Sequence, residues 1–173
     1  MTANLGELKR LIGCYEHEAS ESTVDVYREF FKGSKVSKAT IHWLLTHEDC
    51  YLACAAFRAL PYERQEELEE SVQCFKERGD DDGDNLYYYA ESEWATAEDL
   101  HRFSLMEQGQ YPFDTDELHV VVANNPKVQR ITLEGLSKKD TYAGVIAKDN
   151  LYSLYEREKR KAVHKVKLFR RVN

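Results

Sequence analysis

Two short spacings of cysteine and histidine are where this sequence comes closest to a metal site. The first is Cys14-x-x-His17 and the second is His47-x-x-Cys50. Each would place two ligands on one face of a helix, and together they form a Cys2His2 set of the kind that zinc accepts. Structural zinc sites usually take at least one ligand pair from a tight turn, and neither pair lies beside one. Cysteines that pack as small buried residues explain the pattern equally well, so we expect no metal and no other cofactor.

Carboxylates form the second candidate site, along a helix that Pro61 begins. At about 100° per residue its glutamates share one face, whereas Leu68, Val72 and Phe75 fall on the opposite face. The stripe is about 21 Å long and continues into aspartates, so its charge spacing approaches the ~3.4 Å of one DNA strand. This array predicts a surface that binds the basic groove of a partner protein; the alternative is a solvated surface helix. The predicted partner-binding residues are Glu63, Glu66, Glu67, Glu70, Glu77, Asp80, Asp81, Asp82 and Asp84.

Basic side chains gather near the other end of the chain. Because Tyr152, Tyr155 and Phe169 could stack on bases, this run could bind phosphate groups or nucleic acid. The alternative is that it docks on the acidic segment of the same chain or of a second copy, which leaves a homodimer open. The candidate anion-binding residues are Arg157, Lys159, Arg160, Lys161, Lys165, Lys167, Arg170 and Arg171.

Familiar catalytic motifs are absent from the sequence. It contains neither of the glycine-rich phosphate loops GxxxxGK[ST] and GxGxxG, nor the nucleophile elbow GxSxG. His17-Glu18 and His47-Glu48 begin like the zinc-protease motif HExxH, but Glu21 and Tyr51 stand where the second histidine is needed. We therefore expect no catalytic residues. The alternative is an enzyme whose site is assembled from residues that are distant in sequence.

Charge is sorted along the chain. Residues 1–60 carry 8 acidic and 7 basic side chains, residues 61–118 carry 18 and 4, and residues 119–173 carry 5 and 13. The net charge of −7 therefore hides a central segment of −14 and a C-terminal segment of +8. Such asymmetry indicates charged partners or internal pairing.

Composition bounds the class of protein. A chain of 173 residues that is 42% hydrophobic and 12% aromatic is typical of one large folded domain or two small ones. No apolar run approaches the ~20 residues of a membrane span, so we expect no membrane partner. The four cysteines show no disulfide spacing, which favours the reducing cytoplasm.

The elements that would position these side chains differ between the two halves. Helical periodicity and capping residues predict about five helices in a first domain, 1–79, with the fourth, about 50–60, buried nearly all round. The aspartate-rich stretch 80–85 reads as a linker. Residues 86–173 predict an α+β domain with a mainly antiparallel sheet.

The elements of this second domain follow from its sequence pattern. Its expected strands are 86–94, 117–123, 127–133, 141–147 and 165–172, and a short helix follows the Thr96 cap. Residues 150–164 favour a helix, the alternative being a hairpin strand at 151–155. The predicted fold class is therefore α+β.

The charge pattern leads to three functional hypotheses. The first is a non-enzymatic cytoplasmic protein whose acidic surface binds and inhibits or regulates a nucleic-acid-handling protein, as an inhibitor from a phage or mobile element would. The second is a nucleic-acid-binding protein that uses the basic C-terminal run. The third is the enzyme with a spatially assembled site. Binding to DNA or RNA with an affinity that falls steeply as the salt concentration rises would favour the second hypothesis over the first.

Overall fold

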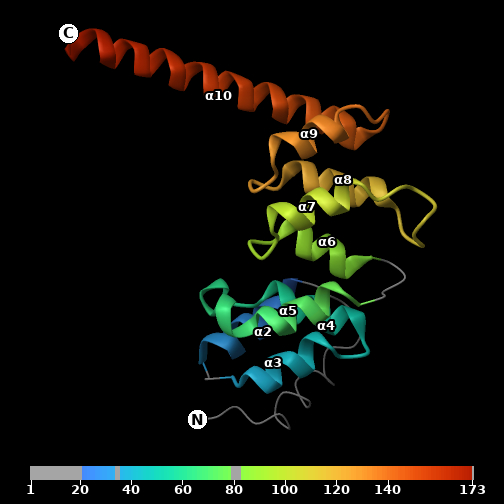
Figure 1. Cartoon of the computed structure of the whole chain (residues 1–173). Helices are drawn as coiled ribbons and strands as arrows, with labels where there is room; N and C mark the ends of the chain where they lie inside the picture. The colour runs from blue at the N-terminus through green and yellow to red at the C-terminus, as the bar shows by residue number, and fades with distance from the viewer. Residues whose placement is uncertain (1–20, 34–35, 79–82, 173) are drawn as a thin grey trace. The chain divides into compact units, whose positions relative to one another are not determined.

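The computed structural model of the chain describes residues 21–33, 36–78 and 83–172 (Figure 1). Within these residues the regular structure is entirely helical, with nine α-helices, one 3-10 turn and no strand. The expected α+β class is therefore wrong. The helix expected near the N-terminus lies outside the described residues.

Backbone contacts divide the chain into two compact units, which we call the first unit (Met1–Trp94) and the second unit (Ala95–Asn173). The boundary lies beyond the predicted linker at 80–85. Part of that linker, 80–82, is outside the described residues, and Asp84 and Asn85 belong to a helix of the first unit. Whether 1–79 and 86–173 fold as separate domains stays a prediction.

The first unit is built around one buried helix. Its elements are α2 (Glu21–Gly33), α3 (Lys38–Leu45), α4 (Cys50–Arg58), η1 (Tyr62–Arg64), α5 (Gln65–Lys76) and α6 (Asp84–Glu91). Helix α4 packs against α2, α3, α5 and α6, and every residue from Leu52 to Phe57 is buried. The helices predicted for the described part of 1–79 are confirmed as α2 to α5. At the start of α3 the Ser37 hydroxyl accepts from the Thr40 N–H at 3.1 Å.

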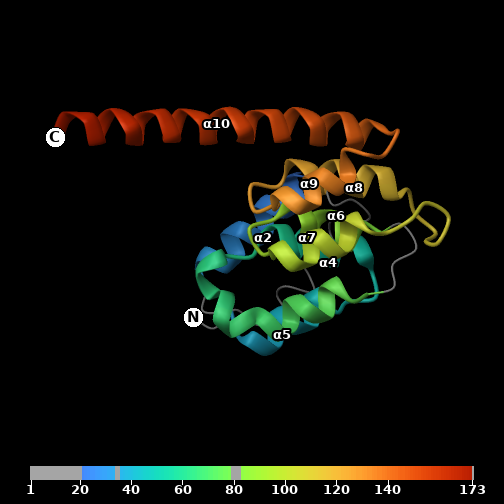
Figure 2. The ribbon, with the colours of Figure 1, turned by 45° about the horizontal axis from the view of Figure 1, so that its top comes forward.

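The second unit comprises α7 (Ala97–Ser104), α8 (Thr115–Asn124), α9 (Arg130–Leu136) and α10 (Tyr142–Val172). Helix α8 contacts the other three. Helix α10 has 31 residues, about 46 Å at ~1.5 Å per residue. Its first half, as far as Glu158, lies along α8 and α9, and the rest projects past them, as Figures 1 and 2 both show.

The stretches expected as strands fall on or beside α6, α8, α9 and α10 instead. In α8 the buried residues Leu118, Val121 and Val122 follow helical spacing. Neighbouring residues are buried too, because other helices cover this short helix on more than one side. A short apolar run of this kind cannot be told from a strand by its periodicity. Packing against three neighbouring helices outweighs the strand preference of consecutive valines.

Buried side chains from later elements satisfy the carbonyl ends of helices in the first unit. The last four carbonyls of a helix lack a partner in that helix. The Asn85 amide, which is 1% exposed, donates to the carbonyls of Phe75 and Lys76 at 3.1 Å and of Arg78 at 3.2 Å. The Arg78 guanidinium donates in turn to two carbonyls at the end of α3, those of Leu45 and His47. Helices α3, α5 and α6 are therefore joined through their ends.

The second unit uses the same device at the end of α7. The Lys139 ammonium donates to the carbonyls of Ser104 at 3.1 Å and Met106 at 3.4 Å. His119, buried on α8, places its Nε2 3.1 Å from the Phe103 carbonyl and donates to it. Because cations near a helix C-terminus interact favourably with the helix dipole, Lys139 stabilises α7 by charge as well. Similarly, Asn150 on α10 donates to the last-turn carbonyl of Ala123 on α8 at 2.8 Å.

His119 and Lys139 also affect each other. The ammonium lies 3.3 Å from both ring nitrogens, which places it over the imidazole rather than in line with one lone pair. Burial, and then the Lys139 charge, lower the pKa of His119. Burial likewise lowers the pKa of Lys139. His119 therefore stays neutral in the folded protein below the pH at which an exposed histidine is protonated.

A glycine pair tests how α10 is attached. At Gly144 an added Cβ would lie 2.1 Å from the Lys139 carbonyl oxygen, whereas at Gly135 on α9 it would meet nothing within 4 Å. We expect Gly144→Ala to lower the free energy of unfolding by about 1–3 kcal/mol. The matched Gly135→Ala should raise it by up to ~1 kcal/mol, because alanine is the better helix former. Urea denaturation monitored by circular dichroism measures both, and equal effects would contradict this packing.

The His119 contacts predict that acid weakens the second unit. The unfolded histidine takes up a proton near pH 6.5 and the folded one, with its lowered pKa, only at lower pH. Stability is therefore fully present above pH 6.5 and decreases as the pH falls below it. We expect hydrogen exchange of α7 and α8, corrected for its intrinsic pH dependence, to accelerate between pH 7 and 5.

A variant can separate this effect from general acid unfolding. His119→Gln keeps an N–H donor for the Phe103 carbonyl but does not titrate, so its exchange should be faster at pH 7 and change less between pH 7 and 5. His47→Gln, in the first unit, should keep the wild-type slope. An unchanged slope in His119→Gln would show that another group drives the acid effect.

Candidate functional site

Helix α5 presents its carboxylates on a face that the core holds in place. Leu68, Val72 and Phe75 are 0–5% exposed, and Phe75 stacks on Phe57 of α4 with ring centroids 4.4 Å apart. The opposite side is solvent-exposed, so the two faces lie as the helical spacing predicts. We call the exposed glutamates of η1 and α5 the acidic face: Glu63, Glu66, Glu67, Glu69, Glu70 and Glu77. Glu69 is exposed as well but lies to the side of the other glutamates at about 100° per residue, so the helical spacing did not include it.

Half of the acidic face is already engaged within the chain. Arg64 binds the Glu67 carboxylate with two nitrogens, at 2.7 and 3.0 Å, and this hydrogen-bonded pair lowers the pKa of Glu67. Lys38 of α3 binds Glu70 at 3.0 Å and lowers its pKa in the same way. Glu77 accepts a hydrogen bond from Gln73.

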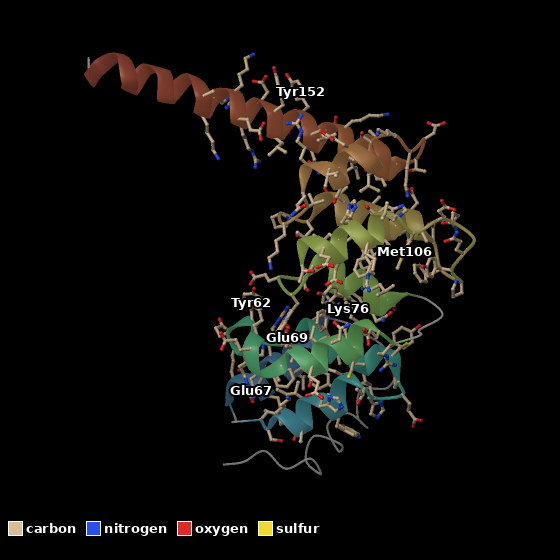
Figure 3. The ribbon with its side chains drawn as sticks, viewed as in Figure 1. Tyr62, Glu67, Glu69, Lys76, Met106 and Tyr152 are labelled. Carbon is tan, nitrogen blue, oxygen red and sulfur yellow. The ribbon has the colours of Figure 1, made fainter. Side chains whose placement is uncertain are left out.

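The other half of the acidic face is available to a partner. Glu63, Glu66 and Glu69 make no hydrogen bond or ion pair to the part of the chain that the structure describes. Figure 3 shows Glu67 and Glu69 on the ribbon of the first unit. The acidic face is therefore held in position by its paired members, whereas its unpaired carboxylates are open to solvent.

Of the four aspartates expected to extend this surface, Asp84 alone lies within the described residues. Asp80, Asp81 and Asp82 lie outside the described residues. Asp84 is half-buried in the first turn of α6. Burial of the Tyr88 phenol raises its pKa, and the Asp84 charge is the second cause of this rise. Acidic side chains stabilise a helix N-terminus, so Asp84 has a local structural role there.

The cysteine and histidine set shows no metal geometry where it can be inspected. Cys14 and His17 lie outside the described residues. The His47 Nδ1 accepts from the Asp49 N–H at 3.1 Å, and its ring meets Trp43 edge-on at 5.0 Å. Among the described residues, no three His, Cys, Asp or Glu side chains come close enough to hold an ion, and Cys50, Cys54 and Cys74 are free thiols.

Four of the predicted basic residues lie near the middle of α10, around Glu158, which pairs with Arg130 of α9 at 3.8 Å. Their side chains are exposed: Arg157, Lys159, Arg160 and Lys161. Lys165, Lys167, Arg170 and Arg171 continue the same helix, but their side chains lie outside the described part. Tyr152 and Tyr155 are 69% and 58% exposed and lie within about one and a half turns before Arg157; Figure 3 labels Tyr152. The structure thus places aromatic and basic side chains along one projecting helix.

The described residues also form two cavities that the sequence did not indicate. A cavity of about 360 Å³ opens in the first unit, with Arg28, Arg58, Tyr62 and Trp94 among its lining residues. A second, of about 300 Å³, lies between α9 and α10, where Arg130 donates to the Glu134 carboxylate at 2.8 Å and forms an ion pair with Glu158 at 3.8 Å. No helix in the described residues is long and apolar enough to cross a membrane.

Comparison with known proteins adds no assignment. A scan against protein-family models, a search of curated proteins and a search of solved structures each found no match for this chain.

Proposed function

We propose that this chain is a non-enzymatic interaction protein whose acidic face binds a basic surface of a nucleic-acid-handling protein and competes there with nucleic acid. The observation that carries the proposal is the arrangement of α5. Its buried side is held by the core, and Glu63, Glu66 and Glu69 face solvent without a partner in the described chain.

The internal ion pairs support the proposal by adding rigidity. Arg64 and Lys38 hold the Glu67 and Glu70 carboxylates in fixed positions while leaving 48% and 74% of these side chains exposed. A preorganised array loses less conformational entropy on binding than free side chains do. Complementary charge also accelerates encounter with a basic groove, an effect that weakens as salt is raised.

A second candidate function follows from α10. Tyr152 and Tyr155 are exposed next to a run of bases on a helix that extends past its packing partners. Basic side chains that follow a phosphate backbone, combined with aromatic rings that stack on bases, are the means by which single strands are bound. This candidate predicts direct, salt-dependent binding of nucleic acid, whereas the first predicts none.

Reversing the unpaired half of the acidic face should abolish binding of the partner protein. Glu63→Lys, Glu66→Lys and Glu69→Lys break no ion pair in the described chain, so each should change the free energy of unfolding by less than ~0.5 kcal/mol. Like charges facing the partner can cost several kcal/mol. Pull-down from a nuclease-treated lysate, followed by mass spectrometry, should recover a nucleic-acid-handling protein with the wild type only.

The matched control carries the same charge change in the second unit, as Glu117→Lys, Asp140→Lys and Asp149→Lys, and should keep the partner. Wild-type protein should also displace labelled DNA or RNA from the recovered protein. If the two triple variants recover the same proteins, or the recovered protein keeps its nucleic acid, the acidic face is only a solvated surface.

The α10 candidate is tested in parallel by a second charge reversal: Arg157→Glu, Lys159→Glu, Arg160→Glu and Lys161→Glu. Fluorescence anisotropy with a labelled single-stranded oligonucleotide at low salt reports direct binding. If the wild type binds and this variant does not, the second function is correct. No binding at any salt concentration eliminates it.

A further inference from the structure

The cavity in the first unit combines features that no single local motif would bring together. Its volume of about 360 Å³ falls within the ~300–1,000 Å³ of small-molecule sites. Side chains from α2, α4, η1, α6 and the segment that follows α6 line it, and all of them belong to the first unit. Those that carry the argument are Arg28, Arg58, Tyr62, Glu91, Glu93 and Trp94.

Two aromatic rings form a fixed corner of this cavity. The rings of Tyr62 and Trp94 meet at 78° with centroids 5.5 Å apart. Trp94 is 7% exposed and its backbone is tied down, because its carbonyl accepts from the Tyr89 hydroxyl at 3.2 Å and its N–H donates to Ser92 at 3.1 Å. A planar ligand can stack on one ring and meet the other edge to face, which are the favoured aromatic geometries.

The two arginines supply donors on the same cavity from different helices. The Arg58 guanidinium lies over the Tyr88 ring at 5.0 Å, which limits its freedom. Arg28 binds Asp25 at 2.8 Å with its side chain 43% exposed. A guanidinium carries five N–H donors in a rigid fork that matches phosphate oxygens, so an arginine that already has partners in the protein can still donate to an anion.

Charge of both signs restricts the class of ligand. Glu91 and Glu93 line the cavity as well, so a bare anion is repelled by two carboxylates while two arginines attract it. A ligand that complements this lining offers an anionic group for the arginines, a hydrogen-bond donor for Glu91 and a flat ring for the aromatic corner. A nucleotide has all three, as its phosphate, its ribose hydroxyls and its base.

We propose that this cavity binds a nucleoside monophosphate unit. The base stacks against Tyr62 and Trp94, the phosphate accepts from Arg28 and Arg58, and Glu91 accepts from the ribose hydroxyls, as acidic residues do in dinucleotide sites. The unit is either a free nucleotide or the terminal residue of a strand, which present the same chemistry. This proposal does not depend on the acidic face or on α10.

Isothermal titration calorimetry on the full chain tests the proposal. The probes are the four ribonucleoside monophosphates, the four nucleosides, inorganic phosphate, tryptophan and a 5′-phosphorylated pentanucleotide. At least one monophosphate should bind ~tenfold or more tightly than inorganic phosphate, which lacks the base that stacks, and than its own nucleoside, which lacks the charge-assisted hydrogen bonds of the phosphate. Equal or tighter binding of the pentanucleotide identifies a strand end as the source, and weaker binding identifies the free nucleotide.

Variants assign the binding to this cavity. Arg28→Gln, at a partly exposed position, should weaken the monophosphate ~tenfold while leaving its nucleoside unchanged. Tyr62→Ala should weaken both, and Arg102→Gln on α7 should weaken neither. Circular dichroism confirms that each variant folds. Absence of binding by all four monophosphates, preference for tryptophan, or an unchanged affinity in Arg28→Gln would overturn the proposal.

Discussion

The carbonyl groups at the C-terminal ends of short helices need hydrogen-bond donors from elsewhere in the chain, and the fold of this protein depends on supplying them. The eight helices from α2 to α9 have only seven to thirteen residues, so the four carbonyls that each helix leaves without a partner are a large fraction of its backbone. An unsatisfied buried polar group costs about 1–3 kcal/mol. At the ends of α3, α5, α7 and α8 the partners are side chains from later elements: Arg78, Asn85, His119, Lys139 and Asn150. These bonds tie helices end to end as well as face to face, so each unit depends on a few polar residues together with its apolar core.

This constraint also decides what the polar residues are available to do. The cluster of His119 and Lys139 has lowered pKa values and would suit acid–base chemistry by composition. Its hydrogen bonds, however, go to the carbonyls of α7, and both side chains are committed to that helix end. A perturbed pKa here therefore reflects burial and structural bonding. The side chains left for binding are those outside the capping network, on the outer face of α5, on the projecting part of α10 and around the cavity of the first unit.

The two charged surfaces differ in how they are supported. The acidic face lies on a helix whose inner side is buried and whose end is held by Asn85, with Glu67 and Glu70 anchored by ion pairs. The basic residues lie from the middle of α10 onward, where the helix gains little stability from its neighbours. A rigid acidic array favours recognition of a preformed basic groove. An exposed basic helix with tyrosines favours a flexible polyanion, which can adapt to it.

The sequence by itself determined the features that depend on near neighbours. The Ser37 and Thr96 caps, the buried helix α4 and the two faces of α5 follow from spacing within one or two turns. Only the tertiary structure decided that the valine-rich run of α8 is a helix, because its preference depends on the three helices that cover it. Only the tertiary structure decided the role of Asn85 as well. Its neighbourhood, which is rich in aspartates, predicts a linker residue, but it is buried against the C-terminal end of α5, whose carbonyls accept from its amide. The tertiary structure also decided the cavity corner of Tyr62 and Trp94, 32 positions apart, which forms only when η1 and the end of α6 meet. The local sequence pattern shows which face of a helix is apolar. It does not show which distant side chain will donate a hydrogen bond to the carbonyls at the end of that helix.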